Sequence, residues 1–245
     1  MGSHCSGTGK NLRKIVARKV KEKKRKTKGI LICFMGIDGS GKSTLAIKTK
    51  EILLTHGIQT KYVWGGYNLF VLRPIVKMIR KVVTRKHNPF KDYSQYHSSL
   101  KELGRRKFLF KTYQYLLLFE YLIEILIKIK IPLWLGQNII SDRYIFDTAT
   151  NIASNYDLSF EEHKRLIDSL LRLCPMPDII YFADIPEEVA LKRKEDIPSV
   201  EYLTNRRKYY KKISNHYNVI TLDGSDNLDN LSDFLNKSIK AFLTP

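Results

Sequence analysis

Cysteine is scarce in this sequence, and the few cysteines form no pattern. The 245 residues contain three, Cys5, Cys33 and Cys174, which are far apart and fall in no CxxC or Cys/His spacing. The spacing excludes the common zinc motifs and gives no disulfide framework. Thiols without such a framework fit a reducing compartment, so the sequence predicts a cytoplasmic protein.

A long uncharged hydrophobic run is also absent. Residues 116–135 are the most apolar stretch, but four charged side chains interrupt it: Glu120, Glu124, Lys128 and Lys130. A membrane-spanning helix needs about 20 nearly uncharged residues, so this stretch is predicted to be a core or interface helix. Residues 1–29 lack the apolar segment of a cleavable secretory signal.

Acidic residues are outnumbered. The chain has 43 Lys and Arg against 24 Asp and Glu, a net charge of +19. Residues 1–29 hold eleven basic residues against Glu22 alone, a net +10, and the remaining 32 basic and 23 acidic residues give +9. We therefore predict a disordered basic tail at 1–28 that binds an anionic membrane or nucleic acid, and a folded domain at 29–245. Such a protein would be peripheral at a membrane surface.

The first six residues allow two interpretations. Met1-Gly2-Ser3-His4-Cys5-Ser6 fits the N-myristoylation pattern, with Cys5 available for a palmitoyl chain. Gly-Ser-His after a start methionine is also what a cloning vector leaves behind.

Apolar runs alternate with helical patterns along the domain. Strands are predicted at 30–34, 60–64, 138–141, 179–183 and 219–222. Helices are predicted at 42–55, 69–86, 100–131, 146–155, 159–173 and 228–242, with another beginning at Pro186. Gly65-Gly66 is predicted to be flexible and 88–99 to be a loop. This alternation predicts a three-layer α/β/α fold with a parallel sheet, as in P-loop NTPases.

A complete P-loop motif follows the first predicted strand. Gly36-x-x-x-x-Gly41-Lys42-Ser43 lies between that strand and a helix, which disfavours a chance glycine-rich turn. Lys42, at an exposed helix start, should reach the β- and γ-phosphates of ATP, and Ser43 should ligate Mg²⁺. The predicted nucleotide-binding residues are Gly36, Asp38, Gly39, Ser40, Gly41, Lys42, Ser43 and Thr44.

Two further clusters bear on the reaction. Asp142-Arg143-Tyr144 ends a predicted parallel strand, where Asp142 could hold the metal or orient the acceptor and Arg143 could grip a phosphate. A structural Asp–Arg pair is the alternative. Arg193, within Lys192-Arg193-Lys194, could neutralise the transferring phosphoryl group, or the three could be a solvated helix face.

These motifs together resemble the thymidylate kinase family over residues 29–242. The similar segments are residues 34–44, Ser141-Asp142-Arg143-Tyr144 and residues 177–193. The resemblance implies ATP- and Mg²⁺-dependent phosphoryl transfer to a (deoxy)nucleoside monophosphate such as dTMP, and a homodimer through residues 108–131. It also implies that Asp38 contacts the acceptor's sugar or a metal-bound water, that Arg143 binds its phosphate, and that Arg193 serves a lid at about 192–206.

Three positions depart from the family pattern. The loop Val63–Asn68 lacks the usual arginine and Glu-Pro, the stretch Phe119–Leu122 lacks an Asp-Arg pair, and Asp147 stands where serine is usual. The donor side therefore matches the family, and the acceptor side is altered. The alternative acceptors are a nucleoside, a sugar phosphate or a lipid-linked group.

Two other classes of protein compete with a kinase. A GTPase switch would need Asn-Lys-x-Asp, and Asn236-Lys237-Ser238-Ile239 lacks the aspartate. A nucleic-acid or membrane-surface binding protein with an idle kinase fold fits the basic tail. The presence of Lys42, Ser43, Asp142 and Arg193 argues against idleness.

Overall fold

The computed structural model describes residues 29–66, 93–95, 98 and 107–244. The basic tail, Cys5 and the predicted helix at 69–86 lie outside these residues. Most of the predicted loop at 88–99 does so too, but residues 93–95 are helical, so the loop prediction is wrong there.

Five parallel strands form one sheet, which confirms the predicted α/β class. They are β1 (Leu31–Met35), β2 (Thr60–Trp64), β3 (Asn138–Asp142), β4 (Ile179–Asp184) and β5 (Val219–Asp223). Their order across the sheet is β2-β3-β1-β4-β5, and every pairing is parallel. All carboxyl ends therefore meet at one edge, where open α/β sheets bind their ligands.

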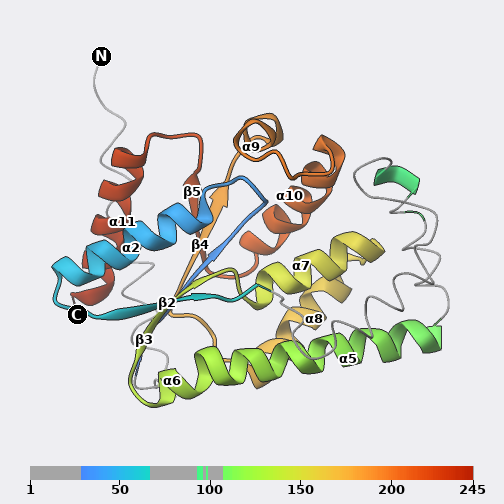
Figure 1. Cartoon of the computed structure of the whole chain (residues 1–245), viewed down its shortest axis with the longest axis horizontal. Helices are drawn as coiled ribbons and strands as arrows, with labels where there is room; N and C mark the ends of the chain where they lie inside the picture. The colour runs from blue at the N-terminus through green and yellow to red at the C-terminus, as the bar shows by residue number, and fades with distance from the viewer. Residues whose placement is uncertain (1–28, 67–92, 96–97, 99–106, 245) are drawn as a thin grey trace.

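Helices cover both faces of the sheet (Figure 1). On one face lie α2 (Lys42–Thr55) and α11 (Leu228–Leu243). The other face carries α5 (Lys107–Ile125), α7 (Ile145–Tyr156), α8 (Phe160–Leu173) and α10 (Val200–Ser214). β1 sends Leu31, Cys33 and Met35 into the second layer and Ile32 and Phe34 into the first, all at most 1% exposed. This alternation follows from the two-residue repeat of a strand, and it makes β1 the centre of both cores.

The helix predicted at 100–131 extends further than expected. α5 continues through a π-helical turn, η1 (Leu126–Lys130), into α6 (Ile131–Trp134). Pro132 in α6 has no N–H to give to the preceding turn, and the widened turn lies directly before it. Residues 100–106 of the predicted helix lie outside the described residues.

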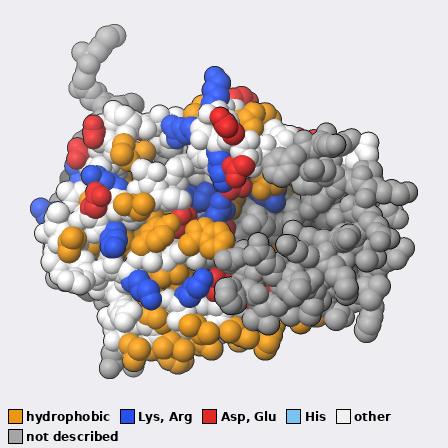
Figure 2. Space-filling model, viewed as in Figure 1, with side chains coloured by type: hydrophobic (Ala, Val, Ile, Leu, Met, Phe, Trp, Pro, Cys, Tyr) orange, Lys and Arg blue, Asp and Glu red, His pale blue; other side chains and the backbone are white. Residues whose placement is uncertain are grey.

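One side of this long helix is apolar and exposed. We call it the outer apolar face: Tyr115, Phe119, Ile123, Ile127, Ile131, Trp134 and Leu135, which are 40–73% exposed. The first five follow at intervals of four residues and so lie along one side of the helix. Figure 2 shows a band of apolar side chains along the lower edge of the molecule, where Figure 1 places α5 and α6. None of the described helices is long and apolar enough to cross a bilayer.

Two helix starts test the capping predictions. Ser159 and Glu162 form the predicted capping box before α8, with the Ser159 N–H donating to Glu162 at 2.8 Å. α9 (Glu187–Arg193) begins one residue later than expected, since Pro186 precedes the first turn as its N-cap.

Gly65 is buried and tightly held, so the prediction of a flexible link there is wrong. Its N–H donates to the Asp142 carbonyl at 2.9 Å, and its carbonyl accepts from Tyr121 Oη at 3.2 Å. A Cβ at Gly65 would lie 2.4 Å from the carbonyl oxygen of Arg143. Glycine is therefore required because the β2 end passes against the β3 end.

Candidate active site

The P-loop (residues 36–41) joins β1 to α2 with glycines in backbone conformations that other residues rarely adopt. Gly39 and Gly41 have φ values of +80° and +83°. A Cβ at Gly39 would lie 2.4 Å from the Ala190 carbonyl oxygen of α9, whereas a Cβ at Gly41 would meet no atom within 4 Å. The absence of a side chain at Gly39 therefore lets the loop pack directly against α9, and the open space beside Gly41 leaves room for a phosphate.

Lys42 lies in the wall of the cleft and is buried. Its side chain is 4% exposed, so the prediction of an exposed helix start is wrong. Its ammonium donates to the Ile37 carbonyl and, at 3.3 Å, to Ser40 Oγ. Burial and the charge of Arg143 lower the pKa of Lys42 to about 8, although three carboxylates nearby oppose this. Among the described residues no carboxylate lies within ion-pair distance, so a phosphate would meet a cation without a direct counter-ion.

The structure brings the two predicted metal ligands together. Ser43 Oγ donates to Asp142 Oδ2 at 2.5 Å, and Tyr62 Oη donates to the same oxygen at 2.8 Å. Asp142 is 1% exposed, and its Oδ1 is buried without a hydrogen-bond partner among the described residues. A hydroxyl oxygen beside an incompletely satisfied carboxylate is the oxygen donor set that Mg²⁺ prefers, so these residues fit that ion.

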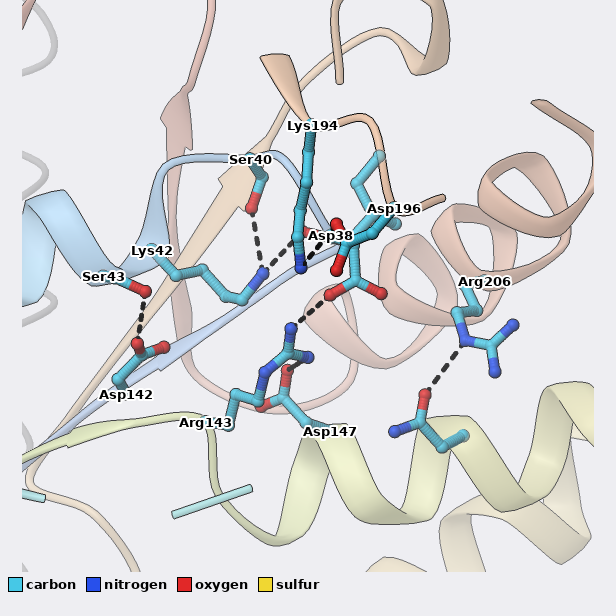
Figure 3. A network of polar contacts seen from close by, with 12 residues as sticks. Asp38, Ser40, Lys42, Ser43, Asp142, Arg143, Asp147, Lys194, Asp196 and Arg206 are labelled. Carbon is cyan, nitrogen blue, oxygen red and sulfur yellow. Dashed lines mark hydrogen bonds and ion pairs between the residues drawn. The ribbon is translucent and has the colours of Figure 1, made fainter. Parts of the chain in front are cut away.

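Asp38 and Arg143 form an ion pair in the same cleft (Figure 3). Arg143 Nη2 donates to Asp38 Oδ1, and Tyr202 Oη of α10 donates to Asp38 Oδ2 at 3.2 Å. Burial alone would raise the pKa of Asp38, but the charges of Arg143 and Lys42 outweigh it and hold this pKa at about 2. Asp38 is therefore a carboxylate throughout the physiological range.

Asp147 approaches Arg143 from the first turn of α7. Its Oδ1 lies 3.7 Å from Arg143 Nη1 and accepts from Tyr210 Oη at 2.8 Å. Burial raises the pKa of Asp147, and the charges of Arg143 and Lys42 work against this. The Arg143 guanidinium thus lies between two carboxylates, which raise its pKa despite the opposing effect of burial.

A cleft of about 750 Å³ opens at the carboxyl edge of the sheet, and Asp38, Lys42, Ser43 and Arg143 line it. It contains residues 38–45, Arg143, Arg193, Lys194 and the β5–α11 loop at 224–228. Arg193 Nη1 donates to the Gly224 carbonyl of that loop at 2.9 Å. Gly36 lies behind the cleft, where a Cβ would be 2.7 Å from the Ala183 carbonyl oxygen. Asp142 is not among the residues that line the cleft, and it is connected to the cleft by its hydrogen bond with Ser43.

Sequence reasoning missed three contributors: Lys194, the β5–α11 loop and Tyr202. The loop could have been found, because it follows a parallel strand at the ligand-binding edge. Lys194 belonged to the predicted cationic cluster Lys192-Arg193-Lys194, but only Arg193 was predicted to act in the site. It lies over Asp38 in Figure 3 and pairs with Asp196 at 3.3 Å. Tyr202 carried no sequence signal of its own.

The family model for thymidylate kinase matches residues 34–235. The chain belongs to the thymidylate kinase family. A thymidylate kinase of Buchnera aphidicola is 26% identical over 231 residues, which cover 88% of this chain and 97% of that protein. A thymidylate kinase of Leptospira interrogans is 27% identical over 226 residues, covering 89% and 95%. One of Chlorobaculum parvum is 31% identical over 173 residues, covering 67% and 65%.

Membership of the thymidylate kinase family makes this chain a nucleotide-binding phosphotransferase. The comparisons favour this over a GTPase switch, an idle fold and an acceptor outside the nucleoside monophosphates. The departures remain visible in the structure. Phe119 is 62% exposed, Glu120 and Tyr121 point inward, and no arginine stands among Phe119–Leu122.

Proposed function

We propose that this protein transfers the γ-phosphoryl group of ATP to the 5′-phosphate of dTMP. The observation that carries the proposal is the placement of two cations on the same cleft, Lys42, which is buried, and Arg143, which is half-buried. Lys42 belongs to the P-loop and faces the donor phosphates, and Arg143 at the end of β3 faces the acceptor phosphate. The relatives named thymidylate kinase support dTMP as the acceptor.

On the donor side, the P-loop N–H groups and Lys42 bind the β- and γ-phosphates. Lys42 exchanges its contacts with Ile37 and Ser40 for phosphate oxygens, and this restores the full charge that burial disfavours. The β5–α11 loop lies farther along the cleft and offers polar atoms to the base of ATP. Ser43 and Asp142 would hold Mg²⁺, which neutralises charge that develops on the phosphate oxygens.

On the acceptor side, Arg143 orients the phosphate that receives the phosphoryl group. Its guanidinium is already oriented by Asp38, so little conformational freedom is lost when the phosphate binds. Asp38 remains available to the acceptor's sugar or to a metal-bound water.

The proposed lid, at about 192–206, brings Arg193 and Lys194 toward the P-loop. Tyr202 connects this segment to Asp38, and Arg206 stacks on the Tyr202 ring at 3.6 Å. Closure would place two more positive charges near the transferring phosphoryl group.

A coupled ADP-release assay tests the proposal. The full chain is supplied with ATP, Mg²⁺ and, one at a time, dTMP, other nucleoside monophosphates, nucleosides and sugar phosphates. We expect turnover with dTMP that is lost in Lys42→Met. Turnover with a sugar phosphate or nucleoside but not with dTMP would overturn the proposed acceptor.

We also propose a homodimer through the outer apolar face. Seven large apolar side chains on one side of a helix form an exposed surface of the kind that subunit interfaces cover, and a second copy offers the matching surface. Sedimentation velocity should give a dimer for the parent chain and a monomer for Phe119→Glu. Leu54→Glu, at a residue 60% exposed on α2, is the control and should remain dimeric. A monomeric parent chain would contradict this proposal.

The tail at 1–28 is proposed to bind anionic lipid without contributing to catalysis. Its support is the cluster of eleven basic residues against one acidic residue at 1–29. Removal of residues 1–28 should abolish co-sedimentation with phosphatidylserine vesicles at low salt and leave kcat unchanged. Unchanged vesicle binding, or retention on nucleic acid alone, would overturn the lipid assignment.

A further inference from the structure

We propose that Asp147 is a positioning residue that, together with Asp38, holds the guanidinium of Arg143 from two sides and so fixes where the acceptor's phosphate binds. The part that concerns the acceptor rests on the proposed function, since it takes Arg143 as the phosphate ligand. The part that concerns the guanidinium can be tested without any substrate.

The two carboxylates hold different nitrogens of the same side chain. Arg143 Nη2 donates to Asp38 of the P-loop, and Nη1 lies 3.7 Å from Asp147 of α7 (Figure 3). An arginine side chain loses rotamer entropy when it is fixed, so its end stays in one place only where several contacts hold it. Contacts at both Nη atoms fix the rotation and the direction of the guanidinium plane, which one contact alone would leave free.

The backbone of Arg143 is already fixed, so the side chain is what remains to be positioned. Arg143 has a φ of +69°, its N–H donates to the Phe34 carbonyl at 3.0 Å, and its carbonyl accepts from Ser141 Oγ at 2.5 Å. A left-handed backbone is unfavourable for arginine and persists where the surroundings enforce it. It aims the side chain into the cleft, and the carboxylates then hold its end.

Asp147 is itself held rigidly enough for this task. Its Oδ2 accepts from the Tyr144 N–H at 3.2 Å, and its Oδ1 accepts from Tyr210 Oη at 2.8 Å. The Tyr210 ring stacks on Phe182 of β4 with centroids 5.8 Å apart. Asp147 is 1% exposed, and a buried carboxylate is unfavourable unless it is paired. The hydrogen bond to Tyr144 closes the first turn of α7, but this capping role needs no charge.

The first measurement follows the Arg143 guanidinium by nitrogen NMR of the substrate-free full chain. In the parent chain we expect slow rotation about the Cζ–Nε bond and separate Nη signals, assigned by their loss in Arg143→Lys. Asp147→Asn keeps the shape and the capping acceptor but removes the charge, and rotation should accelerate at least tenfold. Tyr210→Phe keeps the carboxylate and should give a smaller acceleration. Unchanged rotation in Asp147→Asn would overturn the proposal whatever the acceptor is.

The second measurement is the split between the two Michaelis constants. Asp147→Asn should raise KM for dTMP about tenfold and change KM for ATP less than twofold. In an Arg143→Ala background the same substitution should have no further effect on KM for dTMP, because residues that act through one another are not additive. An equal effect in both backgrounds would indicate a merely structural role and overturn the positioning function.

The control is a similar trio centred on Asp168 of α8. Tyr217 Oη donates to Asp168 Oδ1 at 2.8 Å, and Lys164 Nζ lies 2.9 Å from Asp168 Oδ2. Asp168→Asn should change neither the Arg143 signals nor either KM. If the parent chain does not phosphorylate dTMP, the proposed function fails, while the NMR result still decides whether Asp147 holds Arg143.

Discussion

The two ends of the cleft differ in the contacts that they give to their cations. On the donor side, the Lys42 ammonium donates to a carbonyl and a hydroxyl and has no carboxylate partner in the part of the chain that the structure describes, and its pKa is lowered to about 8. On the acceptor side, Arg143 lies between Asp38 and Asp147, and its pKa is raised. A buried cation without a direct counter-ion favours any polyanion that arrives, whereas a paired cation is oriented but partly neutralised. We therefore expect the donor side to provide affinity and the acceptor side to provide geometry.

The two ends are also assembled differently. The donor side comes mainly from one continuous segment, residues 36–45, completed by the β5–α11 loop. The acceptor side draws on the ends of β2 and β3, α7 and α10. Gly65 joins the ends of β2 and β3, Tyr210 joins α10 to Asp147 of α7, and Tyr202 joins α10 to Asp38 of the P-loop. A continuous loop can keep its function while the rest of the chain changes. An assembly of several elements can be altered one contact at a time.

The largest effect is expected at Lys42. Lys42→Met preserves most of the buried volume and removes the charge, so kcat should fall by about 10²–10³, the usual loss when one group that stabilises the transition state is removed. Steady-state kinetics and thermal unfolding of the same preparation measure activity and stability together. Lys48→Ala, on the surface of α2, should behave like the parent chain. Near-parental turnover in Lys42→Met would mean that the charge of Lys42 is not needed for the reaction, and would contradict the role given to the donor side.

The next effect separates Arg143 from the lid. Arg143→Ala should raise KM for the acceptor about tenfold or more, because it removes a contact made before the reaction. Arg193→Ala should lower kcat about tenfold, because its contact with the phosphoryl group forms on closure. Lys192→Ala changes a neighbouring exposed lysine that does not line the cleft, and serves as the control. If both arginine variants had small and equal effects, Arg143 and Arg193 would be surface ion-pair residues.

A smaller effect concerns the base. A site that hydrogen-bonds a base can reject others by about 10⁴-fold, but only when its polar reader is present. The stretch Phe119–Leu122 offers no arginine, and Tyr121 Oη is engaged with the Gly65 carbonyl. We expect kcat/KM for dTMP to exceed that for uridylate or cytidylate by no more than about tenfold. A ratio of 10³ or more would mean that another residue reads thymine, and that the acceptor side is as well conserved in function as the donor side.

How far the sequence predicted the structure also differs between the two ends. The P-loop was predictable because its residues are contiguous and its flanking strand and helix have clear patterns. The pairing of Ser43 with Asp142, 99 residues apart, followed from one rule, that parallel strands end at a common edge. Every strand was located within one residue of its observed ends.

What the sequence did not reveal depends on tertiary contacts. Tyr202 reaches Asp38 across 164 residues, and Tyr210 reaches Asp147 across 63. No local spacing encodes such pairs, because it is the tertiary packing that brings α10 against the P-loop and α7. The burial of Lys42 was missed for the same reason, since its side chain folds back onto Ile37 and Ser40 of the P-loop, against which α9 and the loop after β5 pack. Gly65 looked flexible because the close approach of β3 has no local signature.

The last effect concerns stability and not activity, and tests whether the acceptor-side layer, the helices α5, α7, α8 and α10 on one face of the sheet, is the less stable layer in acid. His163 of α8 is fully buried and contacts Thr150 Oγ1 of α7 at 3.3 Å through Nε2, while Nδ1 has no hydrogen-bond partner among the described residues. Burial lowers the pKa of His163 to about 4. The unfolded chain, with a pKa of about 6.5, therefore binds a proton between pH 6.5 and 4 that the folded chain does not. The contribution of neutral His163 to the free energy of unfolding is fully present above pH 6.5 and is lost as the pH decreases toward 4. From pH 7 to pH 5 the loss should be about 2 kcal/mol, from the 1.36 kcal/mol that each pKa unit represents.

Urea unfolding of the parent chain and His163→Gln between pH 7 and pH 5 measures this loss as the difference between the two pH profiles. The variant should lose about 2 kcal/mol less over that range. His56→Gln, at an exposed histidine that follows α2 on the donor side, should follow the parent profile. Hydrogen exchange at pH 5 should then show α7 and α8 less protected relative to α2 in the parent chain than in His163→Gln. Identical profiles for the parent and His163→Gln would mean that the acceptor-side layer tolerates the buried charge as well as the donor side does.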